Sequence, residues 1–368
     1  MTQSSGEVFA RLGGEVIDPP VLMDAAIPLE LSGEAVRARL CIFSDQDNRD
    51  VALRPDLTLP LAVQEVAFRK AGDNDEKTVR YAAKAFRLPS APGDQTEFVQ
   101  VGCERYGLPS TPKTDAELFG VVTEEIAAAG IKSIEVRLGD LAIFDSFVSA
   151  LDVPASVRAA LKRAFREDGG IKALFSTERV ERTSVARRLR ETSAAEARAT
   201  VKEMMDLSGV ELIGTRTLDE IVTRLVEQAK DGDIADVPEE AQAILLALTE
   251  LDVPALEAAA ALTQLTGQAQ LSSVGHQIER LAERITAMTA IAPGVLDHAR
   301  FSTSFGRRFT YYDGFVFEIG PPADPYQRAF GAGGRYDRLL DRLSDGQVKA
   351  TAIGAVIRPD RIAALGRS

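Results

Sequence analysis

The sequence predicts an α+β fold that is interrupted by a helical insertion. Segments rich in β-forming residues lie in the first two-fifths and the last fifth of the chain. Between residues 155 and 290, Ala and Leu dominate, β-branched runs are rare and helical periods repeat. We therefore expect one α+β domain in two halves, residues 1–154 and 293–368, with a helical insertion at residues 155–292.

The composition is that of an ordinary globular protein. The chain has 368 residues, of which 45% are apolar and 27% charged, and its formal net charge is −12. This charge argues against a nucleic-acid partner, which needs a basic footprint. No apolar run approaches the length of a membrane span, and no secretory signal is visible, so we expect a cytoplasmic protein with Cys41 and Cys103 reduced.

The first half predicts alternating strands and helices. After the helix-breaking pair Pro19-Pro20, we expect strands at 39–43 and 51–53 and an amphipathic helix at 59–69. Two further strands, 78–87 and 97–106, flank a polar loop. A helix from 114 to 129, a strand at 133–139 and a helix at 140–150 complete this half.

In the insertion, Ser193-Ala-Ala-Glu196 is a capping-box pattern ahead of a helix, Pro238 opens another helix, and a third covers 272–290. The arginine-rich stretch 179–198 also carries glutamates, which favours a solvated helix face over a docking surface for an acidic partner.

The second half places an aromatic strand beside a glycine-rich segment. Residues 311–319 contain β-formers in partial alternation, and Gly331–Gly334 is expected to form a turn that lets the backbone approach a small ligand. The chain then closes with a strand near 350–357 and a short helix that starts at Pro359.

Recognition of a zwitterion is the chemistry that the polar residues favour. On the strand 97–106, alternation places Gln100 and Glu104 on the same face. Carboxylates and amide oxygens there can accept hydrogen bonds from an ammonium group, arginines can hold a carboxylate, and tyrosines can form a wall; the candidates are Asp56, Gln100 and Glu104, then Arg87 and Arg307, then Tyr311, Tyr312 and Tyr336. A buried structural network within the sheet explains the same residues equally well.

The sequence lacks the residue patterns of metal-binding, nucleophilic and nucleotide-binding sites. The two histidines, His276 and His298, are far apart and have no further ligands at metal-binding spacing, so we expect no metal site and read both as plain surface or helix residues. No nucleophile elbow, phosphate loop or dinucleotide fingerprint is present, and we expect no cofactor.

Several motifs in order resemble those of histidyl-tRNA synthetases. Arg54-Pro-Asp-Leu-Thr58 is similar to their Arg-Pro-Glu-Gly-Thr, and Phe86-Arg87 with Phe98–Glu104 is similar to their motif 2. The stretch Arg307–Glu318 resembles their histidine-specific motif, and Gly333-Gly-Arg-Tyr-Asp337 matches their Gly-Gly-Arg-Tyr-Asp. The resemblance implies the fold of class II aminoacyl-tRNA synthetases: a mainly antiparallel sheet flanked by helices.

The resemblance also implies a histidine site. It carries the family's pocket onto Thr58, Arg87, Gln100, Glu104, Arg307, Tyr312 and Tyr336. Asp56 stands where the family has Glu, which shortens the side chain by one methylene, about 1.5 Å of reach.

The chain departs from the synthetases where they hold ATP. The loop between Phe86 and Phe98 lacks both family arginines and carries Asp94 and Glu97 instead, which repel a pyrophosphate. Arg358 replaces a motif 3 glycine beside the place of the adenine, and the anticodon-binding domain is expected to be missing.

These departures make the chain similar to the family of ATP phosphoribosyltransferase regulatory subunits. That resemblance implies a non-catalytic, allosteric role in histidine biosynthesis, with L-histidine as ligand. It also implies self-association as a dimer and a hetero-octamer with the short-form catalytic subunit. The alternative is an atypical ATP-dependent ligase that activates histidine.

Overall fold

The computed structural model describes residues 9–90, 94–167, 169–175, 193–207, 218–219, 221–223, 237–267, 272–307, 310–322 and 329–365. These residues fall into two compact units, residues 1–146 with 250–368, and residues 147–249. The helices α12 (Ala258–Thr266) and α13 (Ser272–Ile291) belong to the first unit. The expected domain boundaries, between residues 154 and 155 and between residues 292 and 293, stay a prediction.

The first unit contains a nine-stranded sheet with the order β1-β5-β6-β12-β11-β10-β7-β9-β8 among the described residues. Its neighbours pair antiparallel except for β1 with β5 and β7 with β9. The mainly antiparallel sheet predicted from the sequence is therefore confirmed. The strands are β1 (Glu15–Val16), β5 (Lys77–Phe86), β6 (Glu97–Tyr106), β7 (Glu135–Asp140), β8 (Asp252–Pro254), β9 (Arg300–Ser302), β10 (Phe315–Gly320), β11 (Gly331–Arg335) and β12 (Ala352–Ile357).

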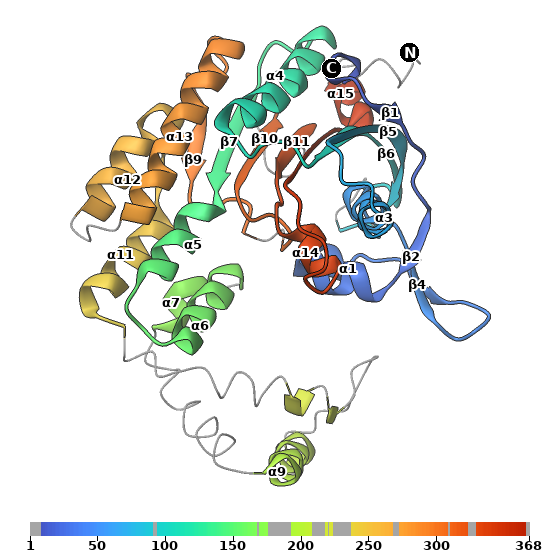
Figure 1. The fold of residues 1–368 in the computed structure, drawn as a ribbon, viewed down its shortest axis with the longest axis vertical. Helices are drawn as coiled ribbons and strands as arrows, with labels where there is room; N and C mark the ends of the chain where they lie inside the picture. The colour runs from blue at the N-terminus through green and yellow to red at the C-terminus, as the bar shows by residue number, and fades with distance from the viewer. Residues whose placement is uncertain are drawn as a thin grey trace. The chain divides into compact units, whose positions relative to one another are not determined.

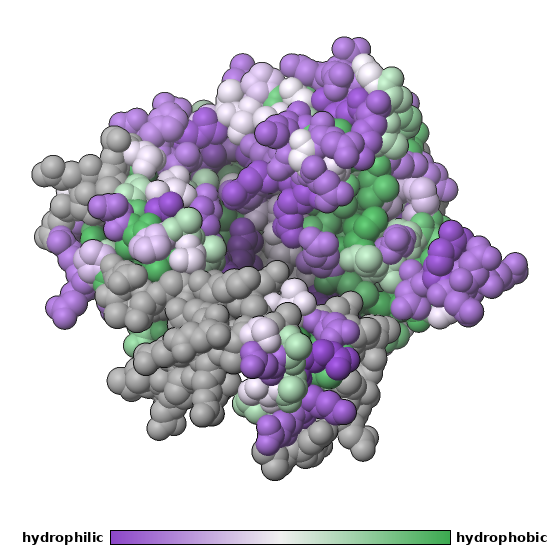
Figure 2. Space-filling model, turned by 60° about the horizontal axis from the view of Figure 1, so that its bottom comes forward, coloured by the Kyte–Doolittle hydropathy of each residue, from purple (hydrophilic) through white to green (hydrophobic). Residues whose placement is uncertain are grey.

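A smaller sheet with the order β2-β4-β3 comes from the N-terminal region. Its strands are β2 (Leu22–Asp24), β3 (Ile42–Ser44) and β4 (Asp50–Leu53). The flanking strands and the residue before β2 expose large apolar side chains: Val21, Leu22, Ile42 and Phe43 are 43%, 49%, 40% and 47% exposed. Figure 2 shows hydrophobic surface beside the polar tip of the β3–β4 hairpin, at the right of the view.

Helices cover both faces of the large sheet. The first unit contains η1 (Ala10–Leu12), α1 (Ala26–Leu31), α2 (Glu34–Arg37), α3 (Thr58–Lys70), α4 (Pro112–Ala128), η3 (Ala255–Glu257), α12, α13, α14 (Leu339–Leu343) and α15 (Pro359–Leu365). Helix α4 starts where Pro112 follows Thr111, whose hydroxyl accepts a hydrogen bond from the Thr114 amide at 3.2 Å. Figure 1 shows α4 and α13 side by side.

The second unit is helical in its described residues, with α6 (Ala155–Arg166), α7 (Gly170–Leu174), α9 (Ala194–Leu207) and most of α11 (Glu239–Glu250). Helix α5 (Leu141–Ala150) runs across the boundary between the units. The predicted capping box is present, because the Ser193 amide donates to the Glu196 carboxylate at 2.9 Å and the Glu196 amide donates back at 3.4 Å. Most of the arginine-rich stretch 179–198 lies outside the described residues.

The expectation of a glycine-rich turn at Gly331–Gly334 was wrong, because these residues form the central strand β11. Each glycine leaves room for a neighbour. A Cβ at Gly331 would lie 2.8 Å from Val122 of α4, and one at Gly333 would lie 2.6 Å from the Phe317 ring. The glycines let α4 and the adjacent strands pack closely on the sheet.

Phe315 and Phe317 of β10 mark the face of the sheet that α4 and α13 cover. The Phe119 ring of α4 meets the Phe317 ring edge-on at 5.3 Å, and the Arg284 guanidinium of α13 lies 4.7 Å from the centre of the Phe315 ring. Because side chains alternate along strands, Val316 and Glu318 lie on the opposite face. That opposite face carries the candidate functional site.

Candidate functional site

Glu104 of β6 lies at the centre of the polar residues that the sequence singled out. Its side chain is 1% exposed. One carboxylate oxygen, Oε1, accepts hydrogen bonds from the Thr58 hydroxyl at 2.7 Å and the Tyr81 hydroxyl at 3.1 Å. The other oxygen accepts a hydrogen bond from the Tyr336 hydroxyl. All three donors are neutral hydroxyl groups, and within the part of the chain that the structure describes no cation pairs with Glu104.

Glycines across the sheet make space for this carboxylate. Gly354 of β12 is the direct neighbour of Glu104, and a Cβ at Gly354 would overlap the Glu104 carboxylate. Gly102 has the same role for Tyr81, whose hydroxyl oxygen would lie 2.5 Å from a Cβ at that position. A bulky residue at either position would displace the charged group or its donor.

Burial raises the pKa of Glu104 from its usual 4.5 to about 7, although the three hydroxyl groups favour the charged form. The nearby Asp56 carboxylate raises it further. The pKa of Asp56 is also raised by burial, while the Arg87 guanidinium opposes that shift. Arg87 therefore offsets the charge of Asp56, and a ligand cation between Asp56 and Glu104 would stabilise both carboxylates.

Asp56 also has a structural role. One of its oxygens accepts a hydrogen bond from the Leu59 amide at 3.0 Å, at the start of α3. Arg87 is oriented in a similar way, because its Nε donates to the Pro55 carbonyl at 2.7 Å. The turn before α3 thus fixes the position of both charged groups.

Three tyrosines form an aromatic wall, as the sequence predicted. The ring centres of Tyr311 and Tyr312 are 4.7 Å apart, and each lies about 6 Å from the Tyr336 ring, at 6.0 and 6.2 Å. Tyr311, Tyr336, Asp56 and Glu104 are all buried. We call Asp56, Thr58, Tyr81, Arg87, Glu104, Tyr311, Tyr312 and Tyr336 the Glu104 cluster.

Two other predicted residues, Gln100 and Arg307, are not part of the Glu104 cluster. Gln100 lies four residues before Glu104 on the same face of β6, and its buried Oε1 has no hydrogen-bond partner among the described residues. That oxygen is available to a ligand donor. Arg307 lies half-buried in the turn before Tyr311, and its contact with a ligand stays a prediction.

Sequence reasoning missed Tyr81. It lies opposite Gly102 in the β5–β6 pairing, next to the Val79–Glu104 pair. Only the register of the two strands brings its hydroxyl to Glu104. The available signal was its alternation on the strand 78–87, which becomes informative once that register is known.

Charged residues near the end of β5 and the start of β6 form ion pairs. Asp94 lies 3.3 Å from the Arg39 guanidinium and accepts hydrogen bonds from Ser90. Glu97 pairs with Lys84 at 2.6 Å. The guanidinium of Arg358 lies 3.9 Å from the centre of the Phe98 ring, so an arginine covers the aromatic face at this position.

The described residues contain neither a metal-binding cluster nor a membrane-spanning helix. No group of three or more His, Cys, Asp or Glu side chains among them could hold a metal ion. No helix in the described ranges is long and apolar enough to cross a bilayer.

The comparisons with known proteins agree with the motifs. The profile of the family described as histidyl-tRNA synthetase matches residues 1–234 and 224–362. ATP phosphoribosyltransferase regulatory subunits from Rhizobium meliloti (strain 1021) and Mesorhizobium japonicum are 27% and 29% identical to this chain. These matches cover 96% and 98% of this chain, and 93% and 95% of those proteins.

Solved structures show the same fold. An ATP phosphoribosyltransferase regulatory subunit/histidyl-tRNA synthetase from Bacillus halodurans C aligns with a TM-score of 0.63 at 20% identity, over 98% of this chain and 77% of that one. The histidyl-tRNA synthetase of Nostoc sp. PCC 7120 aligns with a TM-score of 0.59 at 15% identity, over 98% and 69%. The predicted class II aminoacyl-tRNA synthetase-like fold is thus confirmed.

Proposed function

The chain belongs to the histidyl-tRNA synthetase family, and from this premise we propose that it is a non-catalytic regulatory subunit of ATP phosphoribosyltransferase that binds L-histidine. The names of the relatives support the regulatory role, since they match nearly the full length of this chain. The proposal places the protein at the first step of histidine biosynthesis, in a cytoplasmic complex whose catalysis lies in a partner chain.

The Glu104 carboxylate is the observation that supports histidine as the ligand. It is buried, its three donors are neutral hydroxyl groups, and Asp56 adds a second buried carboxylate. A ligand ammonium would form charge-assisted hydrogen bonds with this pair, and Arg87 would hold the ligand carboxylate. The Gln100 Oε1, which has no hydrogen-bond partner among the described residues, would accept a hydrogen bond from a further N–H group of the ligand.

The same geometry favours binding without reaction. Arg358 covers the Phe98 ring, where the resemblance places the adenine of ATP, and Asp94 pairs with Arg39 in the loop that would face the pyrophosphate. The Lys84–Glu97 pair adds another carboxylate nearby. Arg39 and Lys84 are thus already paired with carboxylates, so neither is free to clamp a phosphate group.

Histidine would act through linkage. It stabilises the conformation of the complex that binds it better, and its effect on the catalytic subunit cannot exceed its differential affinity for the two states.

Calorimetry with the full-length chain tests the ligand. We expect L-histidine to bind the unmodified protein, and Glu104→Gln to weaken binding about tenfold or more because a charge-assisted bond is lost. Glu97→Gln, on the exposed part of the same strand, is the matched control and should bind histidine as the unmodified protein does. Absence of binding heat at millimolar histidine with the fold intact would overturn the proposed ligand.

Two activity assays test the regulatory role against the alternatives. A histidine-activating ligase would catalyse histidine-dependent exchange of pyrophosphate into ATP, and a clear signal would contradict a non-catalytic role. The second assay measures the phosphoribosyltransferase rate of the short-form catalytic subunit with and without this chain. We expect this chain to raise the rate and histidine to lower it, whereas a pure scaffold would leave the rate insensitive to histidine.

Self-association as a dimer is also part of the proposal. The exposed apolar side chains of the small sheet, including Ile42 and Phe43, form a surface that a second copy of the chain would cover. Light scattering tests it. We expect a dimer that Phe43→Asp converts to a monomer in the absence of the catalytic subunit, and a variant that remains dimeric would exclude this surface. The hetero-octamer with the catalytic subunit is tested by the mass of the mixed complex.

A further inference from the structure

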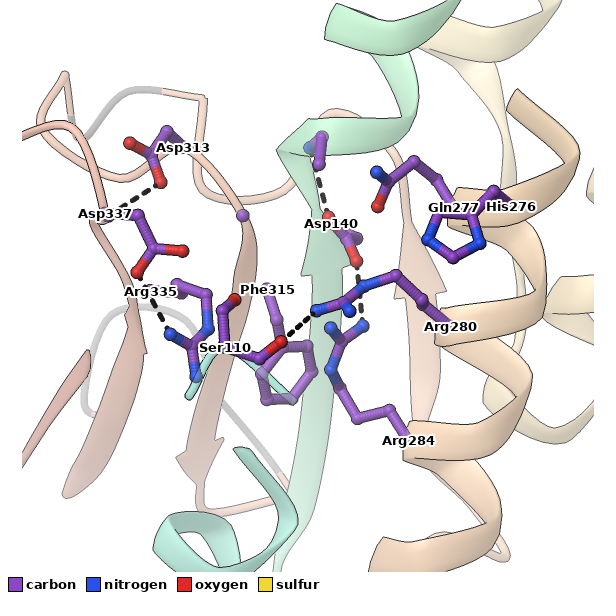
Figure 3. A pocket seen from close by; sticks show the side chains of 12 residues that line it. Ser110, Asp140, His276, Gln277, Arg280, Arg284, Asp313, Phe315, Arg335 and Asp337 are labelled. Atoms are coloured by element: carbon purple, nitrogen blue, oxygen red, sulfur yellow. Dashed lines mark hydrogen bonds and ion pairs between the residues drawn. The ribbon is translucent and has the colours of Figure 1, made fainter. Parts of the chain in front are cut away.

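A second polar cavity lies on the face of the large sheet that α4 and α13 cover, opposite the Glu104 cluster. Its volume is about 250 Å³, and the Glu104 cluster contributes no residue to its lining. Figure 3 shows Asp313 and Asp337 on one side of it, with His276, Gln277 and Arg280 of α13 on the other. A cavity of about 150 Å³ accommodates a benzene ring, so this one can accommodate a molecule of amino-acid size.

Arg280 gives the α13 side of the cavity a positive charge. Its Nη2 donates to the Ser110 carbonyl at 2.9 Å, and no carboxylate among the described residues pairs with it. Arg284, one turn further along the helix, is different because it pairs with Asp115 at 2.7 Å and Asp140 at 2.8 Å. The charge of Arg284 is thus neutralised within the protein, while that of Arg280 is available to a ligand anion.

Asp313 and Asp337 give the opposite side a negative charge. Asp313 accepts hydrogen bonds from the amides of Asp337 at 3.0 Å and Arg338 at 2.7 Å, which fix its carboxylate at the cavity. Asp337 uses Oδ1 to accept from Arg335 at 3.0 Å and from the Ala352 amide at 2.8 Å. No hydrogen bond to its Oδ2 is found among the described residues.

The negative charges of Asp313 and Asp337 repel each other. The pKa of Asp313 is raised to about 6, mainly by burial and also by the charge of Asp337, although the Arg338 amide and side chain oppose the shift. Asp140 also lines the cavity, but Arg284 pairs with it. Arg338 lies 3.4 Å from Asp313, and Arg335 lies 3.0 Å from Asp337, so each carboxylate has one cationic neighbour. A ligand cation beside both carboxylates would reduce the repulsion that remains between them.

We propose that this cavity binds a small zwitterion, with its cationic group at Asp313 and Asp337 and its anionic group at Arg280. The separation of the two charged sides selects a ligand whose charges stand at a matching distance. Binding is non-covalent and needs no further component.

The cavity also connects to the Glu104 cluster through three consecutive residues. Arg335 and Asp337 line the cavity, while the hydroxyl of Tyr336, between them, donates to Glu104. A ligand that moves Asp337 would move the Tyr336 hydroxyl, because the Tyr336 amide is held at Ala352 and the Ala352 amide at Asp337. Binding at the two sites is therefore expected to be coupled, and any such coupling is reciprocal.

Binding of a series of ω-amino carboxylates tests the distance between the two charged sides of the cavity. Glycine, 4-aminobutyrate and 6-aminohexanoate carry the same two charged groups at increasing separation, and butyrate and butylammonium carry one group each. Calorimetry with the full-length chain should show one member of the series binding about tenfold tighter than either one-ended compound, as expected for two charge-assisted contacts. Equal binding of all compounds, or no binding at all, would overturn the proposal.

Variants assign the binding to this cavity. Arg280→Gln and Asp337→Asn should each weaken binding of the preferred compound about tenfold, and Asn at 337 retains the acceptor for Arg335 and Ala352. Glu279→Gln, an exposed change on the same helix that does not line the cavity, is the control. Binding that neither Arg280→Gln nor Asp337→Asn weakens would refute the assignment.

The test is independent of the proposed function. Glu104→Gln should weaken histidine binding about tenfold or more, and should change binding of the preferred compound by no more than about twofold through the coupling, since Gln at 104 still accepts from the Tyr336 hydroxyl. A chain that binds the compound at Arg280 but not histidine would contradict the proposed histidine site alone. A chain that binds histidine but no member of the series would contradict the second cavity alone.

Discussion

Protonation of Glu104 should make the stability of the unliganded protein depend on pH. The pKa of this carboxyl is about 7 in the folded chain against its usual 4.5. Between these two values the folded chain keeps the proton while the unfolded chain has lost it. The free energy of unfolding therefore falls as the pH rises through this window, and the fall ends near pH 7. The shift corresponds to about 3 kcal/mol.

The variant Glu104→Gln keeps the size of the side chain and removes the titration. Urea denaturation of both proteins should show the unmodified chain losing about 3 kcal/mol relative to Glu104→Gln between about pH 4 and pH 8. Other buried acids with raised pKa values, such as Glu318 and Asp313, are present in both proteins, so their contributions cancel. Glu97→Gln is the control for a charge removed from the same strand.

Two outcomes decide the reasoning about Glu104. A difference between the two proteins that stays constant over this range would mean that the folded chain stabilises the charged carboxylate as well as water does. A difference that grows in the opposite direction would mean that an unrecognised cation lies beside it. Either result would remove the argument for a ligand ammonium at this position.

Further predictions concern the ligand, the sheet and a buried ion network. Histidine binding should release a proton from Glu104 below about pH 7, which calorimetry in buffers of different ionisation enthalpy measures; no proton release would contradict the ammonium contact. Gly354→Ala should destabilise the fold by about 2 kcal/mol in urea, whereas Gly275→Ala, with no atom within 4 Å of the added Cβ, should be neutral or stabilising. Arg284→Met should cost about 3–5 kcal/mol because it leaves the buried Asp140 carboxylate unpaired, while Asp115 keeps its ion pair with Arg335; a cost no larger than that of the exposed change Glu283→Gln would refute this.

Part of the site could be predicted because it depends on local spacing. Alternation along residues 97–106 placed Gln100 and Glu104 on one face, and both are buried there. Residue type alone suggested that Tyr311, Tyr312 and Tyr336 form an aromatic wall, and their three rings lie within 6.2 Å of one another. The mainly antiparallel fold also followed from the motifs.

The sequence by itself therefore determined the α+β class, the strand that carries Glu104 and the chemistry of its polar partners, because residue type and short-range periodicity are local properties. Tertiary structure decided what depends on neighbours distant in sequence. Local glycine content predicts a turn at Gly331–Gly334, but pairing with β10 and β12 makes this segment a strand, and its glycines leave space for Val122 and Phe317. Strand register brought Tyr81 to Glu104, and the packing of α13 left Arg280 opposite Asp337.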